Sequence, residues 1–398
     1  MYYSKFKIIV NLLLIICLFS ACKDECADVV CQNGGTCDNG LCDCPSGTFG
    51  DNCESLLDPC AAVLCEADQI CDNGECVCDD TMSNNIEQGV FVINEGNFLS
   101  ANSSLSYYNE ADCINSRNNL YVEANNEALG DVFQSMVKFE DQFLLVINNS
   151  GKIVAVNNTE LTKEAEITNL GTPSHLLATG NAFGEFYLSN IFSSYIYIFD
   201  ANNFTITDSI EVGGGTGPMV KIGNKLFASN IYGDKLFVYD ETDETVNAIQ
   251  LTPGVNSIQK GTDNNSVWVL CSGDYYMPGS AKLHNIKTND ETIDWTVDIT
   301  TGSPSRLEFD DFNGNLYWLN GGVYMLNEFG NIAPETPIIT ADLRNFYGLE
   351  IDGFNNKVWL TDAKDFSQNG ELLLFDLQGN EIDAFTVGII PSGVFINE

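Results

Sequence analysis

Apolar and polar residues alternate in short runs over most of the chain, from about residue 89 to the end. Gly89–Glu95 and Gly393–Glu398 show this alternation, and mainly apolar runs of six residues, such as Phe143–Asn148, Glu185–Asn190 and Lys357–Asp362, give way to residues that favour turns. An alternation of period two is typical of half-buried β-strands. Because no stretch keeps a helical period of 3.6 for long, the pattern predicts an all-β domain over residues 89–398.

These strands recur as a repeating unit. A short strand that often opens with Pro-Ser is followed by an apolar strand ending near Asn and by a third strand ending near Asp or Asn. The unit begins seven times, 38 to 49 residues apart, at Gln134, Pro173, Gly217, Val255, Pro304, Phe346 and Pro391. Repeats of about 40 to 50 residues with four short strands each are typical of propeller blades, so we expect a seven-bladed β-propeller.

The first and last strands of this region have nearly the same sequence. Gly89-Val-Phe-Val-Ile-Asn-Glu95 opens the region and Gly393-Val-Phe-Ile-Asn-Glu398 ends it. A propeller keeps an open sheet edge unless strands from both ends of the chain share one blade. We therefore expect Phe395 beside Phe91. The strands of the shared blade are predicted, from the innermost outward, to be Pro391–Asn397, Val90–Asn94, Leu105–Tyr108 and Leu120–Val122.

The first 25 residues have the features of an export signal. Two lysines precede the apolar run Ile8–Phe19, which is shorter than the roughly 20 residues of a transmembrane helix, so residues 1–21 are predicted to be a signal peptide. The end of the run, Leu18-Phe-Ser-Ala-Cys22, resembles a bacterial lipobox and implies lipidation of Cys22. Residues 22–25 would be the lipid anchor and a tag that resembles the basic-acidic-acidic export tag of Bacteroidetes surface lipoproteins.

We expect from this a chain held by lipid in the outer membrane and exposed at the cell surface. The alternative is a secreted protein in which Cys22 is unmodified.

Residues 26–54 contain six cysteines. Two stretches of this segment are characteristic, Cys31-Gln-Asn-Gly-Gly-Thr-Cys37 and Cys44-Pro-Ser-Gly-Thr-Phe-Gly-Asp-Asn-Cys53. They resemble the EGF-like module. The pairing in that family implies the bonds Cys26–Cys37, Cys31–Cys42 and Cys44–Cys53. So short a segment cannot bury a core, and disulfides formed in an oxidising compartment would restrain it instead.

Residues 55–88 begin a second, incomplete copy of this spacing. The same resemblance implies the bonds Cys60–Cys71 and Cys65–Cys76. Cys78 is then left over, with Cys113 as the preferred partner and Cys271 as the other candidate. Because no histidine lies among these cysteines, disulfides are favoured over a zinc site. We interpret both copies as a spacer before the propeller.

The chain is strongly acidic, with 17 basic and 56 acidic residues and a formal net charge of −39. Such a surface repels nucleic acid and anionic membranes. It is consistent with solubility alone, or with attraction of cationic ligands or divalent ions.

Several stretches of residues 89–398 resemble the YncE-like surface propeller lipoproteins of Bacteroidetes. The stretches are Val90-Phe-Val-Ile-Asn-Glu-Gly-Asn-Phe98, Asn148-Asn-Ser-Gly-Lys-Ile153, Tyr347-Gly-Leu349, Asp362-Ala-Lys-Asp365 and Val387-Gly-Ile-Ile-Pro-Ser-Gly393. Some members of that group capture cobalamin at the cell surface and pass it to a TonB-dependent outer-membrane transporter, whereas others have no established ligand. The resemblance therefore implies cobalamin or a similar corrinoid as a ligand rather than a cofactor, and such a transporter as partner.

One face of a propeller collects the loops that lead into the inner strands and those that join second to third strands. The residues expected on that face, and taken as candidate ligand contacts or their neighbours, are Asn94, Glu95, Asn97, Phe98, Asn149, His175, Asn190, Phe192, Asn230, Tyr232, Asp274, Tyr275, Tyr276, Arg306, Tyr347, Asp362, Lys364, Asp365 and Phe366. Aromatic faces and amides suit a large, flat, amide-rich ligand. The alternative for each Asn is a hydrogen bond from its side chain to the backbone of a strand-end turn.

The sequence contains no nucleophile elbow, P-loop, dinucleotide fingerprint or His-Glu-x-x-His motif. His175 is either an axial ligand to cobalt or a hydrogen-bonded strand residue. A second functional class remains open, a hydrolase or lactonase in which Glu95, Asp362 and Asp365 hold calcium. A third is an adhesive surface protein that binds protein or glycan.

Overall fold

The computed structural model describes residues 26–56, 60, 63–65, 69–72, 75–78, 86, 88–110 and 116–397. The chain divides into two compact units, Met1–Met82 and Ser83–Glu398. Cys22 and the predicted signal peptide lie outside the described residues. Within the described part of the chain, none of the helices has the length and apolar character needed to cross a membrane.

In its described residues, the first unit contains three small hairpins held by disulfides. β1 (Thr36–Asp38) pairs with β2 (Leu41–Asp43), β3 (Thr48–Phe49) with β4 (Ser55–Leu56), and β5 (Gln69–Asp72) with β6 (Glu75–Cys78). The bonds are Cys26–Cys37, Cys31–Cys42, Cys44–Cys53, Cys60–Cys71 and Cys65–Cys76, which confirms the pairing implied by the EGF-like resemblance.

The predicted Cys78–Cys113 bridge cannot be compared with the structure, because the Cys78 side chain and all of Cys113 lie outside its described part. The bridge stays a prediction. Cys271, the other candidate partner of Cys78, is a buried free thiol.

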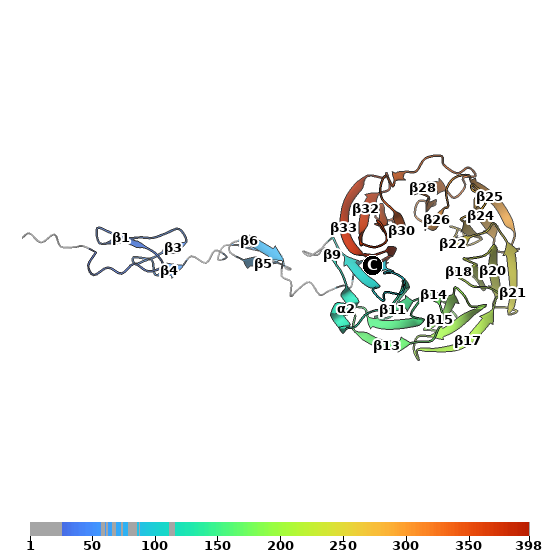
Figure 1. Cartoon of the computed structure of the whole chain (residues 1–398), viewed down its shortest axis with the longest axis horizontal. Coiled ribbons are helices and arrows are strands. Elements are labelled where there is room, and N and C mark those ends of the chain that lie inside the picture. The colour runs from blue at the N-terminus through green and yellow to red at the C-terminus, as the bar shows by residue number, and fades with distance from the viewer. Residues whose placement is uncertain are drawn as a thin grey trace, which may run out of the picture. The chain divides into compact units, whose positions relative to one another are not determined.

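The second unit is a ring of seven four-stranded antiparallel sheets, as predicted (Figure 1). Numbered along the chain and from the inner strand outward, blade 1 contains β10 (Phe133–Phe139), β11 (Gln142–Ile147), β12 (Lys152–Asn157) and β13 (Lys163–Ile167). Blade 2 contains β14 (Pro173–Ala178), β15 (Glu185–Asn190), β16 (Tyr195–Asp200) and β17 (Thr205–Glu211). Blade 3 contains β18 (Met219–Ile222), β19 (Lys225–Ser229), β20 (Lys235–Asp240) and β21 (Thr245–Gln250).

The remaining blades complete the ring in the same order. Blade 4 contains β22 (Val255–Lys260), β23 (Ser266–Cys271), β24 (Ala281–Lys287) and β25 (Ile293–Ile299). Blade 5 contains β26 (Ser305–Asp310), β27 (Asn315–Leu319), β28 (Gly322–Asn327) and β29 (Ile339–Thr340), and blade 6 contains β30 (Phe346–Asp352), β31 (Lys357–Asp362), β32 (Asn369–Asp376) and β33 (Glu381–Ile389). Blade 7 is the shared one, with β34 (Pro391–Asn397), β7 (Gly89–Asn94), β8 (Ser104–Tyr108) and β9 (Ser116–Arg117).

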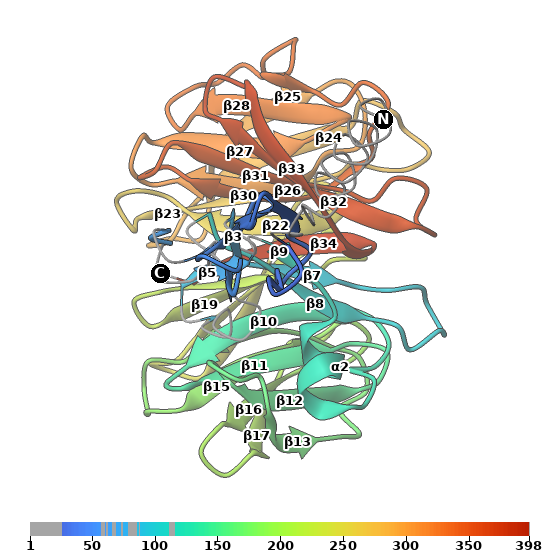
Figure 2. The same ribbon diagram turned by 90° about the vertical axis from the view of Figure 1, so that its left-hand side faces the viewer.

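The two ends of the propeller meet in blade 7. β34 pairs with β7 over its whole length, with Phe395 directly opposite Phe91, and the two strands lie side by side in Figure 2. The Phe395 ring lies 6.5 Å from that of Phe91 and 5.9 Å from that of Phe143 in blade 1. The last strand therefore closes the ring through its backbone and also packs into the core between blades 7 and 1.

One predicted strand of blade 7 is wrong. Leu120–Val122 is not the outermost strand but part of the helix α2 (Leu120–Asn125), which contacts β8 (Figure 2). Consecutive residues Leu120 and Tyr121 are both buried. A helix brings both onto the core, whereas neighbouring residues of a strand point to opposite faces of the sheet. The outer strand is instead the short β9.

Each pair of neighbouring blades encloses its own apolar core. The middle strands are covered on both sides, so Phe143–Ile147 in β11 are all fully buried. The four tryptophans of the chain all contribute to the cores of one side of the ring: Trp268 and Trp295 belong to blade 4, Trp318 to blade 5 and Trp359 to blade 6.

Replacing Phe395 with Ala tests the closure. We expect Phe395→Ala to lower the free energy of unfolding by about 2 to 4 kcal/mol, because it removes a large, mostly buried ring from the seam. Phe354→Ala removes an equally large ring that is 74% exposed, and it should change stability by no more than about 0.5 kcal/mol. Urea denaturation followed by circular dichroism measures both. Equal losses for the two variants would contradict the assigned role of Phe395.

Candidate functional site

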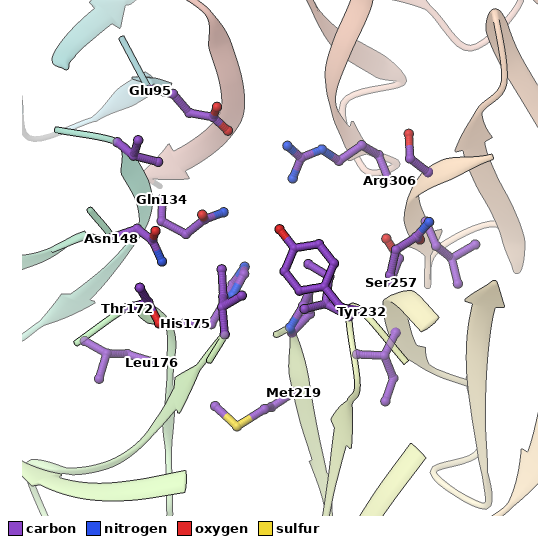
Figure 3. Close-up of a pocket in the computed structure, with 18 of the residues that line it drawn as sticks. Glu95, Gln134, Asn148, Thr172, His175, Leu176, Met219, Tyr232, Ser257 and Arg306 are labelled. Carbon is purple, nitrogen blue, oxygen red and sulfur yellow. The ribbon is translucent and has the colours of Figure 1, made fainter. Parts of the chain in front are cut away.

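A cavity of about 810 Å³ lies at the centre of the ring (Figure 3). Its lining residues come from the beginnings of inner strands and from the loops that follow second strands, and every blade contributes at least one. Inner strands surround it because all seven sheets present their first strand to the axis. The cavity is large enough for a small-molecule ligand, since such pockets usually measure about 300 to 1,000 Å³.

The structure brings eight of the predicted site residues together in this lining. They are Glu95, Phe98, Asn149, His175, Phe192, Tyr232, Arg306 and Tyr347. The other candidates do not line the cavity. They are Asn94, Asn97, Asn190, Asn230, Asp274, Tyr275, Tyr276, Asp362, Lys364, Asp365 and Phe366.

Aromatic side chains mark one side of the cavity. Phe192 and Tyr232 follow the second strands of blades 2 and 3, and their rings stack 5.6 Å apart at an interplanar angle of 9°. They are 76% and 73% exposed, and Phe98 from blade 7 is 66% exposed. The tyrosyl oxygen of Tyr232 points to the centre of the cavity in Figure 3. Since these rings lie outside the apolar cores, they offer flat apolar surface to a ligand.

Tyr275 and Tyr276 are also exposed, at 90% and 88%, but they pack only against each other among the ring contacts of the described residues. Their loop, which Asp274 holds through its bond to the Tyr276 amide, lies away from the cavity lining.

Polar residues at the ends of second strands form hydrogen bonds with the backbone instead of facing the cavity. The side chain of Asn190 donates to the Leu170 carbonyl and that of Asn230 to the Gly215 carbonyl. Buried Asn94 donates to the Ser104 carbonyl, and Asp362 accepts from the Asn345 amide. Asn94, Asn190 and Asn230 thus make side-chain-to-backbone hydrogen bonds of the kind that the alternative interpretation of each Asn expected, and Asp362 makes a similar bond.

The remaining candidates outside the lining also have structural partners. Asn97 donates to the carbonyl of Phe366, whose ring packs edge-on against Tyr347 at 5.5 Å. Lys364 forms an ion pair with Glu371 at 3.0 Å. The Asn97 bond joins the loop after β7 to the loop after β31, where the Phe366 ring packs against Tyr347 at the cavity wall.

Two opposite charges face the cavity from different blades. Arg306 on β26 and Glu95 just after β7 both point into the open centre in Figure 3. Burial raises the pKa of Glu95, while the Arg306 charge and hydrogen bonds from Ser392 and Tyr347 lower it. The Tyr347 hydroxyl lies 3.4 Å from the nearer Glu95 carboxylate oxygen. A ligand here can meet both a donor and an acceptor.

His175 is neutral at neutral pH. Burial, and then the nearby Arg306 charge, lower its pKa to about 4. Its Nδ1 lies 2.8 Å from the Ser174 hydroxyl. The ring thus has the local hydrogen bond that the simpler interpretation of this residue expected, and it adds no positive charge to the cavity.

Sequence reasoning missed the deeper polar residues of the cavity. Gln259 and Glu308 line it, and the Gln259 amide donates to a Glu308 carboxylate oxygen at 2.8 Å. Glu350 lies on β30, the neighbouring inner strand. No sequence signal marked Glu308, because the register slips between Ser305 and Glu308 and interrupts the two-residue period of the strand.

The structure gives no support to the calcium alternative. No three or more His, Cys, Asp or Glu side chains are grouped as metal ligands would be among the described residues. Asp365 accepts bonds from the Ser367 and Gln368 amides, as a turn residue does.

The ring and its central cavity define a seven-bladed β-propeller. Residues 88–387 match a protein family described as a domain of unknown function, DUF5074. Because the match covers most of the chain, the protein belongs to that family. No curated protein matches the sequence.

Solved structures share the fold at low sequence identity. A quinonprotein alcohol dehydrogenase-like protein from Bacteroides thetaiotaomicron is 13% identical with a TM-score of 0.60, covering 79% of this chain and 80% of that one. A functionally unknown protein from Desulfotomaculum acetoxidans is 10% identical with a TM-score of 0.56, covering 78% and 98%. Dihydro-heme d1 dehydrogenase NirN, in complex with DHE, is 8% identical with a TM-score of 0.51, covering 78% and 75%.

Two acidic residues on neighbouring inner strands, Glu308 and Glu350, should make stability depend on pH. Burial raises the pKa of Glu350 from 4.5 to about 8, and burial together with the Glu350 charge raises that of Glu308. A carboxyl with a raised pKa binds extra protons in the folded chain, so stability falls as pH rises from about 5 to 8. We expect a loss of about 1 to 3 kcal/mol over this range.

Glu350→Gln should flatten that decline, and exposed Glu160→Gln should leave it unchanged. Urea denaturation at several pH values measures the slope. A Glu350→Gln slope equal to that of the wild type would show that Glu350 does not cause it.

Proposed function

We propose that this propeller is a ligand-binding protein of the cell surface, and that its central cavity takes cobalamin or a similar corrinoid. The observation that carries the proposal is the stacked, exposed pair of Phe192 and Tyr232 at the cavity. Large aromatic side chains left in solvent beside a cavity cost hydrophobic free energy unless they have a partner.

The chemistry of the lining suits a flat ligand with peripheral amides. The aromatic pair offers surface to a planar macrocycle, and Gln134 offers an amide beside it, whereas the Asn149 amide nitrogen already donates to Asp131. Glu95 and Arg306 add an acceptor and a donor on opposite sides. A corrinoid would have its flat face on the rings and its amides directed to these polar groups.

The N-terminal sequence supports a location of this binding protein at the cell surface. The lipobox-like motif ending at Cys22 would anchor the chain by lipid, and the disulfide-linked hairpins would act as a spacer between anchor and propeller. A TonB-dependent outer-membrane transporter is the partner that this arrangement fits, because a captured corrinoid is too bulky to enter by simple diffusion.

Calorimetric titration of the purified propeller with cobalamin tests the ligand. We expect micromolar or tighter binding. The double variant Phe192→Ala/Tyr232→Ala should weaken it at least about tenfold, or about 1.4 kcal/mol, because both rings of the stack are lost. Tyr275→Ala removes an exposed ring outside the cavity and should leave the affinity within about twofold. Absence of heat and of any change in the visible bands of cobalamin would exclude this ligand.

Metabolic labelling with an alkyne analogue of palmitate tests the anchor in the native cells. Wild type and Cys271→Ala should be labelled, whereas Cys22→Ser should not, because it lacks the acceptor thiol. After detergent extraction of outer membranes, the labelled proteins should co-purify with a TonB-dependent transporter. Label that persists in Cys22→Ser would disprove lipidation at Cys22, and labelled protein that purifies without a transporter would disprove the partner.

A further inference from the structure

Arg306 has a backbone conformation that side chains rarely adopt. Its φ is 55°, and among the described residues of the inner strands no other non-glycine residue has a positive φ. The strand register slips between Ser305 and Glu308, so Arg306 lies in an irregular stretch of β26. A strained backbone conformation at a cavity wall is expected where it serves a function. Here it directs the Arg306 side chain into the cavity, which a regular strand conformation would not do.

The guanidinium is held firmly but has unused donors. Its Nε donates to the Tyr347 carbonyl at 3.0 Å, and its Cζ lies 5.4 Å from the centre of the Tyr347 ring. The two terminal nitrogens have no hydrogen-bond acceptor or ion-pair partner within the described part of the protein, although 56 acidic residues occur in the chain. They point into the cavity (Figure 3).

Among the described residues that line the cavity, Arg306 is the one positive charge. They include no lysine, and His175 is neutral. Of the nearby carboxyls, Glu95 forms no ion pair with Arg306 in the structure, and Glu308 accepts a hydrogen bond from Gln259. Burial raises the pKa of both carboxyls, and the Arg306 charge lowers it. Arg306 is thus a pre-positioned cation that forms no ion pair with a described carboxylate.

We propose that Arg306 binds an oxyanion of the ligand, a phosphate or a carboxylate, while Phe192 and Tyr232 contact its flat apolar part. A guanidinium with two free terminal nitrogens matches such an oxyanion in a bidentate manner. The proposal rests on the proposed function only in that a ligand occupies this cavity. It names the chemical group that the cavity selects, whether the ligand is a corrinoid or another compound.

Two fluorescent probes separate anion recognition from apolar contact. 8-Anilinonaphthalene-1-sulfonate carries an anionic group, and N-phenyl-1-naphthylamine has the same ring system without it. With the purified chain, Arg306→Gln should lower the affinity for the sulfonate probe at least about tenfold and change the affinity for the neutral probe less than about twofold. Arg306→Lys should give an intermediate loss for the sulfonate only, since an ammonium lacks the bidentate geometry. Lys282→Gln, which breaks an ion pair with Asp298 outside the cavity, should affect neither probe.

Arg306→Gly supplies an independent readout. Glycine adopts a positive φ without strain, so this variant should melt at the wild-type temperature or above it while losing affinity for the sulfonate probe. Stable protein with poor anion binding would support the proposal. Equal weakening of both probes by Arg306→Gln, or unchanged sulfonate affinity in Arg306→Gly, would overturn it.

The outcome is independent of the corrinoid itself. If cobalamin does not bind but binding of the sulfonate probe requires Arg306, cobalamin is excluded as the ligand and the anion site is supported. If cobalamin binds but binding of the sulfonate probe does not require Arg306, the anion site is excluded and the proposed binding function is supported.

Discussion

The pairing of the last strand with the first one of the propeller is the constraint on which the rest of the structure depends. β34 and β7 complete the seventh sheet, and only then does the ring have no open edge. The cavity has no separate wall of its own, because it is the space that seven inner strands leave around the axis. Hydrogen bonds between neighbouring inner strands reinforce this arrangement, for example from Ser135 to the Ser174 carbonyl and from Asn256 to the Pro304 carbonyl.

The side chains near the axis fall into two groups: those that form hydrogen bonds within the propeller and stabilise it, and those that remain free to contact a ligand. Most amides near the axis bond to the backbone of a turn or of the next blade, as Asn190 and Gln259 do. The N–H groups of these amides are satisfied within the protein and have little left for a ligand. Phe192, Tyr232 and the terminal nitrogens of Arg306 are different, because the fold alone gives them little or no partner. The site is best recognised by what the structure leaves unused.

The sequence was informative wherever burial enforces a strand period. The second strands were predicted close to their observed limits and the inner strands close to their observed starts, since these strands pack between apolar neighbours and are bounded by turns. It was misleading at Leu120–Val122, where short apolar runs do not distinguish a strand from a helix. The sequence could not separate Asn190, which bonds to the backbone, from Asn149 at the cavity, because both lie near the ends of second strands. Glu308 was missed, since a lone acidic residue in a strand gives no sign of facing an axis rather than solvent.

The uneven placement of tryptophan affects how unfolding of this ring would be observed. All four indoles belong to blades 4, 5 and 6. Tryptophan fluorescence therefore does not report on the unfolding of blades 1 to 3, which contain no tryptophan. If the ring came apart at the seam and lost blade 1 first, far-ultraviolet dichroism would change while emission stayed constant. Transitions that fail to coincide between these two methods would then map the order in which the blades separate, without any introduced label.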